Sequence, residues 1–230
     1  MEYTGAVVRS GPTAVRELDE IVVRKVSVGT MDNNAYLLTC RARGDQVLVD
    51  AAAEPARLLA LVREGSSAAD LTTIVTTHRH ADHHGGLESL HAVTGAEVAA
   101  GAEDADALPV PVTRRLHHGD VLCLGHVALE VVALRGHTPG SVALAYREPA
   151  RTRAPGSVPG RVHLFTGDSL FPGGPGRTTS PRDFAQLMDD LEERVFGRFD
   201  DSTWVYPGHG DDTTLGAERP HLARWRARGW

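Results

Sequence analysis

The sequence predicts an α/β protein in which two β-sheets pack together and helices lie outside them. Three observations indicate this class. Short β-branched runs recur along most of the chain, two amphipathic segments interrupt them in the first half, and a longer amphipathic segment lies between the last two strand signals. Such an order is typical of sheets that are covered by helices.

The first half of the chain alternates strand and helix signals. Leu58, Leu61 and Val62 share one face of a helix predicted over residues 54–65, which has a proline near its start and a glycine at its end. A second helix is predicted over residues 85–95. The predicted strands are residues 21–29, 34–40, 46–50, 71–77 and 96–100.

The second half begins with three consecutive strand signals that are separated by glycine-containing turns. Ser180 is the expected N-cap of a helix over residues 180–197, and Pro181 occupies its first position. A terminal helix is predicted over residues 218–230. The predicted strands are residues 121–125, 126–136, 141–148 and 162–168, followed by a strand and loop over 202–210.

Composition restricts the function classes. The chain has 230 residues, 41% apolar and 23% charged, so we expect one soluble globular domain over residues 1–230. A formal net charge of −6 argues against a nucleic-acid or anionic-membrane partner. We find no secretory signal and no apolar run of membrane-span length, and we expect a cytoplasmic protein. Cys40 and Cys123 lie in apolar surroundings and are expected to be buried thiols.

The segment Thr76–Gly86, TTHRHADHHGG, places four histidines and an aspartate directly after a predicted strand. His78 and His80 alternate, so in extended backbone both side chains project to the same side. Asp82 and His83 follow as the chain turns toward the next helix. Imidazole and carboxylate groups suit zinc, iron or manganese. This segment therefore predicts a metal site, because so polar a loop is costly to bury without such partners.

Three later segments each place one metal-capable side chain beside a glycine, just after a strand. They are His137 in RGHTPGS, Asp168 in FTGDSLF and His209 in YPGHGDD. With the first segment they supply five histidines and two aspartates, which is enough for two metal ions with open positions for water. The other histidines, His163 among them, have no such surroundings and are expected to be ordinary structural or solvated residues.

In this order, the motifs HxHxDH, Gly-His-Thr, Gly-Asp-Ser-Leu-Phe and Gly-His-Gly resemble those of the metallo-β-lactamase superfamily. The closest resemblance is to its glyoxalase II-like (hydroxyacylglutathione hydrolase-like) branch. It covers about residues 20–215, including DNNAYLL at 32–38 and FPGGPGRT at 171–178. The resemblance implies a four-layer αββα sandwich of two mixed sheets flanked by helices, with the motif loops along one edge.

The resemblance also implies a binuclear centre with two zinc ions per chain, for which iron or manganese are alternatives. Its ligands would form two groups that share one carboxylate. The first metal would be held by His78, His80 and His137, the second by Asp82, His83 and His209, with Asp168 bridging them.

Three residues have additional implied roles around this centre. Asp82 could orient the nucleophile and accept a proton as the intermediate collapses. Arg177 could hydrogen-bond a carboxylate of the ligand set or of the substrate, and a surface arginine is an equal alternative. Tyr36 could line the substrate pocket, and a packed strand tyrosine is an equal alternative.

The implied activity is hydrolysis of a small-molecule thioester, or of a related ester, by a metal-bridging hydroxide. A persulfide dioxygenase with one iron, held by His80 or His78 with His137 and Asp168, remains an alternative, as does a lactonase. A β-lactamase is disfavoured because no export signal is seen, and a nuclease because no nucleic-acid-binding arm is found. A non-catalytic metal-binding protein is least favoured because all seven candidate ligands are present.

Substrate recognition is the open part of this interpretation. Glyoxalase II enzymes that bind glutathione use basic and aromatic residues of a C-terminal helical extension, which is not found after His209. A shorter glyoxalase II-like enzyme, or a hydrolase acting on the thioester of another thiol, is therefore expected. The sequence carries no signal for an oligomeric state.

Overall fold

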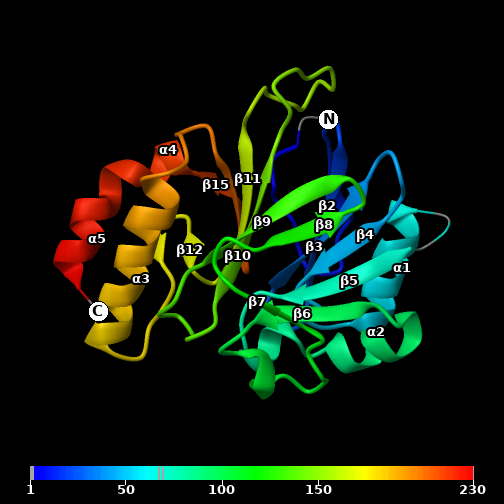
Figure 1. The fold of residues 1–230 in the computed structure, drawn as a ribbon, viewed down its shortest axis with the longest axis horizontal. Helices are drawn as coiled ribbons and strands as arrows, with labels where there is room; N and C mark the ends of the chain where they lie inside the picture. The colour runs from blue at the N-terminus through cyan, green and yellow to red at the C-terminus, as the bar shows by residue number, and fades with distance from the viewer. Residues whose placement is uncertain (1–2, 67, 69, 230) are drawn as a thin grey trace.

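Two β-sheets packed face to face form the centre of this computed structural model, which describes residues 3–66, 68 and 70–229 (Figure 1). The first sheet contains, in spatial order, β1 (Ala14–Glu17), β2 (Ile21–Val28), β3 (Asn33–Cys40), β4 (Gln46–Val49), β5 (Leu71–Thr76), β6 (Glu97–Gly101) and β7 (Arg114–Leu116). Strands β1 to β4 pair antiparallel and strands β4 to β7 pair parallel, so the sheet is mixed.

The second sheet is also mixed. Its strands, in spatial order, are β15 (Thr213–Thr214), β14 (Trp204–Pro207), β11 (Val162–Gly167), β10 (Val142–Arg147), β9 (Val127–Ala133) and β8 (Val121–Leu124). Strands β11 and β14 pair parallel, and the other neighbours pair antiparallel. A separate short hairpin follows β11 and consists of β12 (Leu170–Phe171) and β13 (Gly174–Pro175).

Helices α1 (Pro55–Gly65) and α2 (Leu87–Thr94) cover the outer face of the first sheet (Figure 1). Leu58 of α1 and Leu90 of α2 belong to the same buried cluster as Ile74 of β5. Each of these side chains is fully buried, which contributes about 1.5–3 kcal/mol per side chain. The apolar stripe that the sequence predicts for the first helix therefore faces the sheet.

The second sheet carries the C-terminal helices on its outer face, on the left in Figure 1. The Ser180 hydroxyl caps the first of them by accepting the Asp183 amide hydrogen at 3.1 Å, as the sequence predicts. Leu187 and Trp225 of these helices pack in one buried cluster with Leu164 of β11. The helices are α3 (Pro181–Leu191), α4 (Leu215–Glu218) and α5 (Leu222–Arg228), with a π-helical turn over Glu192–Phe196.

A third buried cluster lies between the two sheets. Val23 and Leu38 of the first sheet pack there with Leu144 and Phe165 of the second, and all four are fully buried. Apolar side chains project from both faces of each sheet. The sequences of the central strands are therefore nearly continuous apolar runs. The layers are thus helix, sheet, sheet and helix, which confirms the predicted αββα sandwich.

Several local features differ from the sequence prediction. Strands β1 and β7 were not predicted, because AVRE and RRL are short, polar stretches that pair at sheet edges. The second predicted helix begins at Leu87 rather than at Gly85. Cys40 is buried as expected, but Cys123 is exposed. The expectation for Cys123 was wrong because β8 is an edge strand whose alternate side chains face solvent.

None of the helices in the described part of the chain combines the length and apolarity that a membrane span requires. The terminal helix predicted over 218–230 is observed as short helical segments up to Arg228, and Trp230 lies outside the described residues. The single domain and the cytoplasmic location stay predictions.

One buried polar network crosses the space between the sheets. His163 is fully buried and donates from Nε2 to the Glu148 carboxylate at 2.9 Å. Its Nδ1 accepts from the Tyr206 hydroxyl at 2.9 Å, and that hydroxyl accepts from Arg16 at 3.1 Å. Burial lowers the pKa of His163 to about 4, which outweighs the opposing effect of Glu148. His163 is therefore a neutral structural residue, as the sequence suggested.

This pKa predicts an acid-sensitive fold. Between pH 6.5 and about 4 the unfolded chain takes up a proton at His163 that the native protein does not. The contribution of His163 to the free energy of unfolding is therefore complete above pH 6.5. It is lost as the pH falls toward 4, by up to about 3 kcal/mol. We expect His163→Gln, whose amide can still bond Glu148 and Tyr206, to lose less stability over this window.

Urea unfolding of metal-free protein at pH 7 and pH 4.5 measures both losses. Metal-free protein is needed because acid also releases bound metals. Equal losses in the wild type and in His163→Gln would show that His163 does not carry this pH dependence.

Candidate metal centre

The structure brings the seven candidate ligands together at one edge of the sandwich. They lie in loops that follow the carboxyl ends of β5, β9, β11 and β14. Because these strands belong to two packed sheets, the four loops meet where the sheet edges meet. The described side chains form three overlapping groups of possible metal ligands, and the ligand atoms of each group lie within 4.8 Å of one another.

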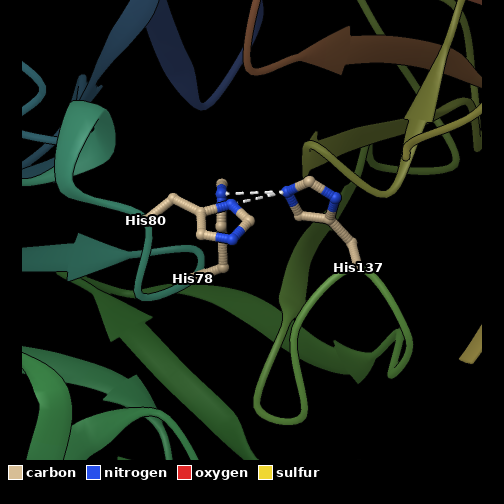
Figure 2. A group of neighbouring side chains, drawn as sticks. All are labelled: His78, His80 and His137. Atoms are coloured by element: carbon tan, nitrogen blue, oxygen red, sulfur yellow. Dashed lines mark hydrogen bonds between the residues drawn. The ribbon is translucent and has the colours of Figure 1, made fainter. Parts of the chain in front are cut away.

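The first group consists of three histidines. Nδ1 of His80 lies 3.0 Å from Nε2 of His137, and Nε2 of His78 lies 3.2 Å from the same atom. Figure 2 shows the rings of His78 and His80 facing the ring of His137, which comes from the turn after β9. His78 is buried whereas His80 is exposed, so this group opens toward solvent on the His80 side.

The second group consists of Asp82, His83 and His209. The two Nε2 atoms of His83 and His209 lie 3.2 Å apart. Oδ2 of Asp82 lies 3.5 Å from Nε2 of His83 and 3.3 Å from Nε2 of His209. Asp82 and His83 sit on a single 3₁₀ turn (Ala81–His83), and the ring of His83 also lies beside that of His78, with their centres 4.1 Å apart.

Asp168 lies between the two groups. Its Oδ2 is 3.6 Å from Nε2 of His137 and 3.6 Å from Nε2 of His209, and its Oδ1 is 3.3 Å from Nε2 of His83. The Oδ1 atom is buried and makes no hydrogen bond within the described part of the chain. A buried carboxylate oxygen that faces a ring nitrogen at 3.3 Å without a well-formed hydrogen bond is the arrangement expected of two atoms that share a cation.

The arrangement fits divalent metal ions. Zinc bonded to imidazole nitrogens at about 2.0–2.1 Å in tetrahedral geometry would hold those nitrogens about 3.3 Å apart. The distances between the facing nitrogens in both groups, 3.0 to 3.2 Å, are close to this value. Lone pairs of several imidazoles that face one another also have no other suitable partner. The site is therefore a divalent metal site built from histidine and carboxylate ligands.

Sequence reasoning missed the residue that orients His83. Asp50 is buried at the end of β4, and its Oδ2 accepts from Nδ1 of His83 at 2.8 Å. Thr77 holds the same carboxylate by donating from its backbone amide at 2.7 Å and from its hydroxyl at 2.8 Å. This fixes the His83 ring with Nε2 turned toward the metal site. The one local signal was an aspartate that ends a buried strand.

Burial and charge set opposite pKa shifts in this cluster. Burial alone would lower the pKa of His83, but the carboxylates of Asp50 and Asp168 raise it to about 10. Burial lowers the pKa of His78, and the neighbouring histidines lower it further. His78 is therefore kept neutral, which is the form that binds metals.

Asn33 is a second residue that the sequence did not single out. It is buried, and its side-chain amide donates to Oδ2 of Asp82 at 2.9 Å. Nδ1 of His209 donates to the backbone carbonyl of Met31 at 3.0 Å. The loop between β2 and β3 and the first residue of β3 therefore support two members of the second group.

The structure places Tyr36 and Arg177 differently. Tyr36 is 2% exposed, and its hydroxyl donates to the Pro207 carbonyl at 2.6 Å, so it packs in the core and does not line a pocket. The backbone carbonyl of Arg177 accepts from Nδ1 of His137 at 2.6 Å, which leaves Nε2 free to face the site. The exposed side chain of Arg177 lines a cavity described below.

Fold and site together define an αββα protein with two neighbouring groups of candidate metal ligands and the carboxylate of Asp168 between them. The family model of the metallo-beta-lactamase superfamily matches residues 28–150. The chain therefore belongs to the metallo-beta-lactamase superfamily, as the motifs indicated.

Curated relatives agree with the predicted branch. The chain is 38% identical over 146 residues to a hydroxyacylglutathione hydrolase from Fuscovulum blasticum and 34% identical over 179 residues to one from Rhodospirillum rubrum. These matches cover 64% and 77% of this chain but span 51% and 62% of the relatives' length. A solved structure of TTHA1623 in a di-iron-bound form is 30% identical, with a TM-score of 0.65 over 85% of this chain and 96% of that one.

The contact between Asp50 and His83 generates a prediction about metal affinity. We expect Asp50→Asn to weaken binding at the second group about 10- to 100-fold, because an amide holds the imidazole less firmly than a carboxylate does. Asparagine also tolerates the positive backbone φ of 60° at this position. Competition with a chromophoric chelator measures the change.

Asp106→Asn is the matched control. The Asp106 side chain is 84% exposed and pairs with Arg115 on the surface, so its loss should leave metal affinity unchanged. Equal affinities in the wild type and Asp50→Asn would mean that the contact with Asp50 does not determine the position of His83.

Proposed function

We propose that this chain is a metal-dependent hydrolase that cleaves a small-molecule thioester, and that it holds two zinc ions. The observation that carries the proposal is the pair of ligand groups joined by Asp168. The relatives named hydroxyacylglutathione hydrolase support the reaction class, and the di-iron-bound neighbour supports the metal count. Iron or manganese would suit the same ligands.

Two divalent ions bound here would supply hydroxide near neutral pH and polarise a carbonyl oxygen. The residues of this chain would bind both ions, and Asp82 would accept the proton. Oδ2 of Asp82 accepts a hydrogen bond from Asn33 and lies 3.3 Å from Nε2 of His209. Burial raises the pKa of Asp82, but the Asn33 bond and the charge on His83 lower it below its ordinary value. Asp82 is therefore ionised at neutral pH and able to accept a proton.

A cavity of about 340 Å³ beside this centre is the proposed substrate site. Its lining residue Gly176 adjoins the ligand His137 on the side of the outer nitrogen, where an added Cβ would lie 3.4 Å from Nδ1. Phe184 supplies an aromatic wall, and the guanidinium groups of Arg177 and Arg228 line the same cavity. Two cations beside an aromatic ring suit a thioester whose thiol part carries carboxylates. Helix α5 thus supplies a basic residue close to the proposed site.

Metal content of zinc-loaded protein tests the centre. We expect about two zinc ions per chain in the wild type and about one in Asp82→Ala, since that variant removes a ligand of the second group only. Elemental analysis gives the count, and release of thiol from S-lactoylglutathione gives the activity, which should fall at least 100-fold in the variant. Asp211→Ala, an exposed residue outside both groups, is the control.

Two outcomes would contradict this proposal. Two bound zinc ions without hydrolysis of any member of a thioester panel would argue against the reaction. One iron per chain, unchanged in Asp82→Ala and accompanied by oxygen uptake with a persulfide substrate, would instead support the dioxygenase alternative.

The cavity generates a separate prediction about specificity. We expect Arg228→Gln to raise the KM for S-lactoylglutathione about tenfold, equivalent to about 1.4 kcal/mol, because a charge-assisted contact is lost. The KM for an uncharged lactoyl thioester and the kcat for both substrates should stay unchanged. Arg224→Gln, an exposed residue of the same helix outside the cavity lining, is the matched control. Equal effects on the charged and uncharged substrates would argue against recognition of a carboxylate by Arg228.

A further inference from the structure

A second cavity, of about 700 Å³, lies at the far end of β14 from the metal centre. Trp204 begins β14 and lines this cavity, whereas His209 follows the carboxyl end of the same strand. At about 3.3 Å per residue the two residues are about 15 Å apart. The cavity is therefore separate from the metal centre.

The wall of this cavity is an ordered part of the fold. The loop between β10 and β11 rises beside the N-terminal strands at the top of Figure 1. The carboxylate of Asp19 accepts the backbone amides of Arg153 at 2.9 Å and Ala154 at 3.2 Å, and the Ser157 hydroxyl accepts the amide of Asp19 at 3.0 Å. These bonds hold the loop against the turn between β1 and β2.

Arg16 is the cation at the base of the cavity. It is 5% exposed, and its guanidinium stacks 4.2 Å from the ring centre of Trp204 and 5.3 Å from that of Tyr3. Its Nη1 donates to the Tyr206 hydroxyl at 3.1 Å. No carboxylate in the described part of the chain forms an ion pair with it. A guanidinium carries five N–H donors, and Tyr206 is its one hydrogen-bond acceptor among the described residues, so the other donors are available to a group in the cavity.

Two neighbouring carboxylates already have other cationic partners. Asp212 pairs with Lys25 at 2.7 Å, and Glu148 pairs with Arg161 at 3.1 Å. Glu17 also lines the cavity, but it follows Arg16 in β1, so its exposed side chain points to the opposite face of the strand, and it forms no ion pair with Arg16 within the described residues. Arg16 is thus a buried cation at this site without an ion-pair partner among the described residues.

Part of the exposed lining is apolar. Val15 is 42% exposed and Val158 is 41% exposed, and both line the cavity with Pro155. Large aliphatic side chains with this exposure lose water contact favourably when an apolar body covers them. The cavity therefore combines a buried cation at its base with apolar side chains at its mouth, where Glu17 and Arg161 also lie.

We propose that this cavity binds a small amphipathic organic anion. Its carboxylate or phosphate group pairs with Arg16, and its apolar body covers Val15, Val158 and the indole of Trp204. The volume lies within the range of about 300–1,000 Å³ that is usual for small-molecule sites. The site is independent of the proposed hydrolase reaction.

Calorimetric titration of the zinc-loaded full chain tests the proposal. Octanoate and octyl phosphate are the probes for the two anionic groups, and octanol is the uncharged control ligand. We expect one octanoate or one octyl phosphate per chain, and binding of octanol at least tenfold weaker. The indole N–H resonance of Trp204 should shift on binding, whereas that of Trp225 should not.

Three variants locate the site. Arg16→Met removes the charge while keeping the stem, and Val158→Asp adds a repelling charge at a position that is 41% exposed, where we expect little effect on folding. Both should weaken octanoate binding at least tenfold. Val121→Asp makes the same change at a valine that is 48% exposed on the distant edge strand β8, and it should bind octanoate as the wild type does.

Three results would overturn the proposal. The first is no octanoate or octyl phosphate binding by folded wild type at millimolar ligand. The second is unchanged affinity in Val158→Asp, which stays interpretable even if Arg16→Met fails to fold. The third is binding that disappears when zinc is removed, because the anion would then sit at the metal centre.

Discussion

The hydrogen bond between Asp50 and His83 is the contact on which the metal centre depends. Asp50 ends β4, His83 follows β5, and their side chains meet at 2.8 Å because the two strands are parallel neighbours in the first sheet. Thr77 fills the remaining acceptor positions of the carboxylate. With Nδ1 of His83 fixed in this way, its Nε2 lies within 3.5 Å of ligand atoms from Asp82, Asp168 and His209. The central ligand of the cluster is therefore set by sheet geometry.

His137 and His209 follow strands of the second sheet, and backbone and side-chain groups from both halves of the sandwich hold them. Backbone carbonyls of Arg177 and Met31 fix the outer nitrogens of His137 and His209, so each ring presents Nε2 inward. The His209 loop is tied down further at Gly210, whose carbonyl accepts from Lys25 at 2.8 Å and from Asn34 at 2.9 Å. Lys25 is fully buried, so this clamp excludes water as it fixes the loop. Such preorganisation fixes the ligand positions at the cost of burying several polar groups.

Much of the fold and of the ligand set was predictable from the sequence, because the signals are local. Apolar β-branched runs mark the central strands, and Ser180 with Pro181 marks the start of α3. Each of the seven candidate ligands follows such a run beside a turn. The edge strands β1 and β7 were missed because they are short and polar, and the exposure of Cys123 because its strand forms an edge, which depends on pairing and not on composition.

By itself, the sequence determined the family, the layer order and the chemical type of the centre, since residue identity and strand order suffice for these. The tertiary structure alone decided which groups support the ligands and where other cavities lie. Asp50 and His83 are 33 residues apart, and Arg16 meets Tyr206 across 190 residues. The tertiary structure also shows that Tyr36 lies in the core and not in a pocket wall. It places Arg228 and Arg177 in the lining of the same cavity. Contacts of this kind depend on how the two sheets pack, and no local pattern in the chain records that packing.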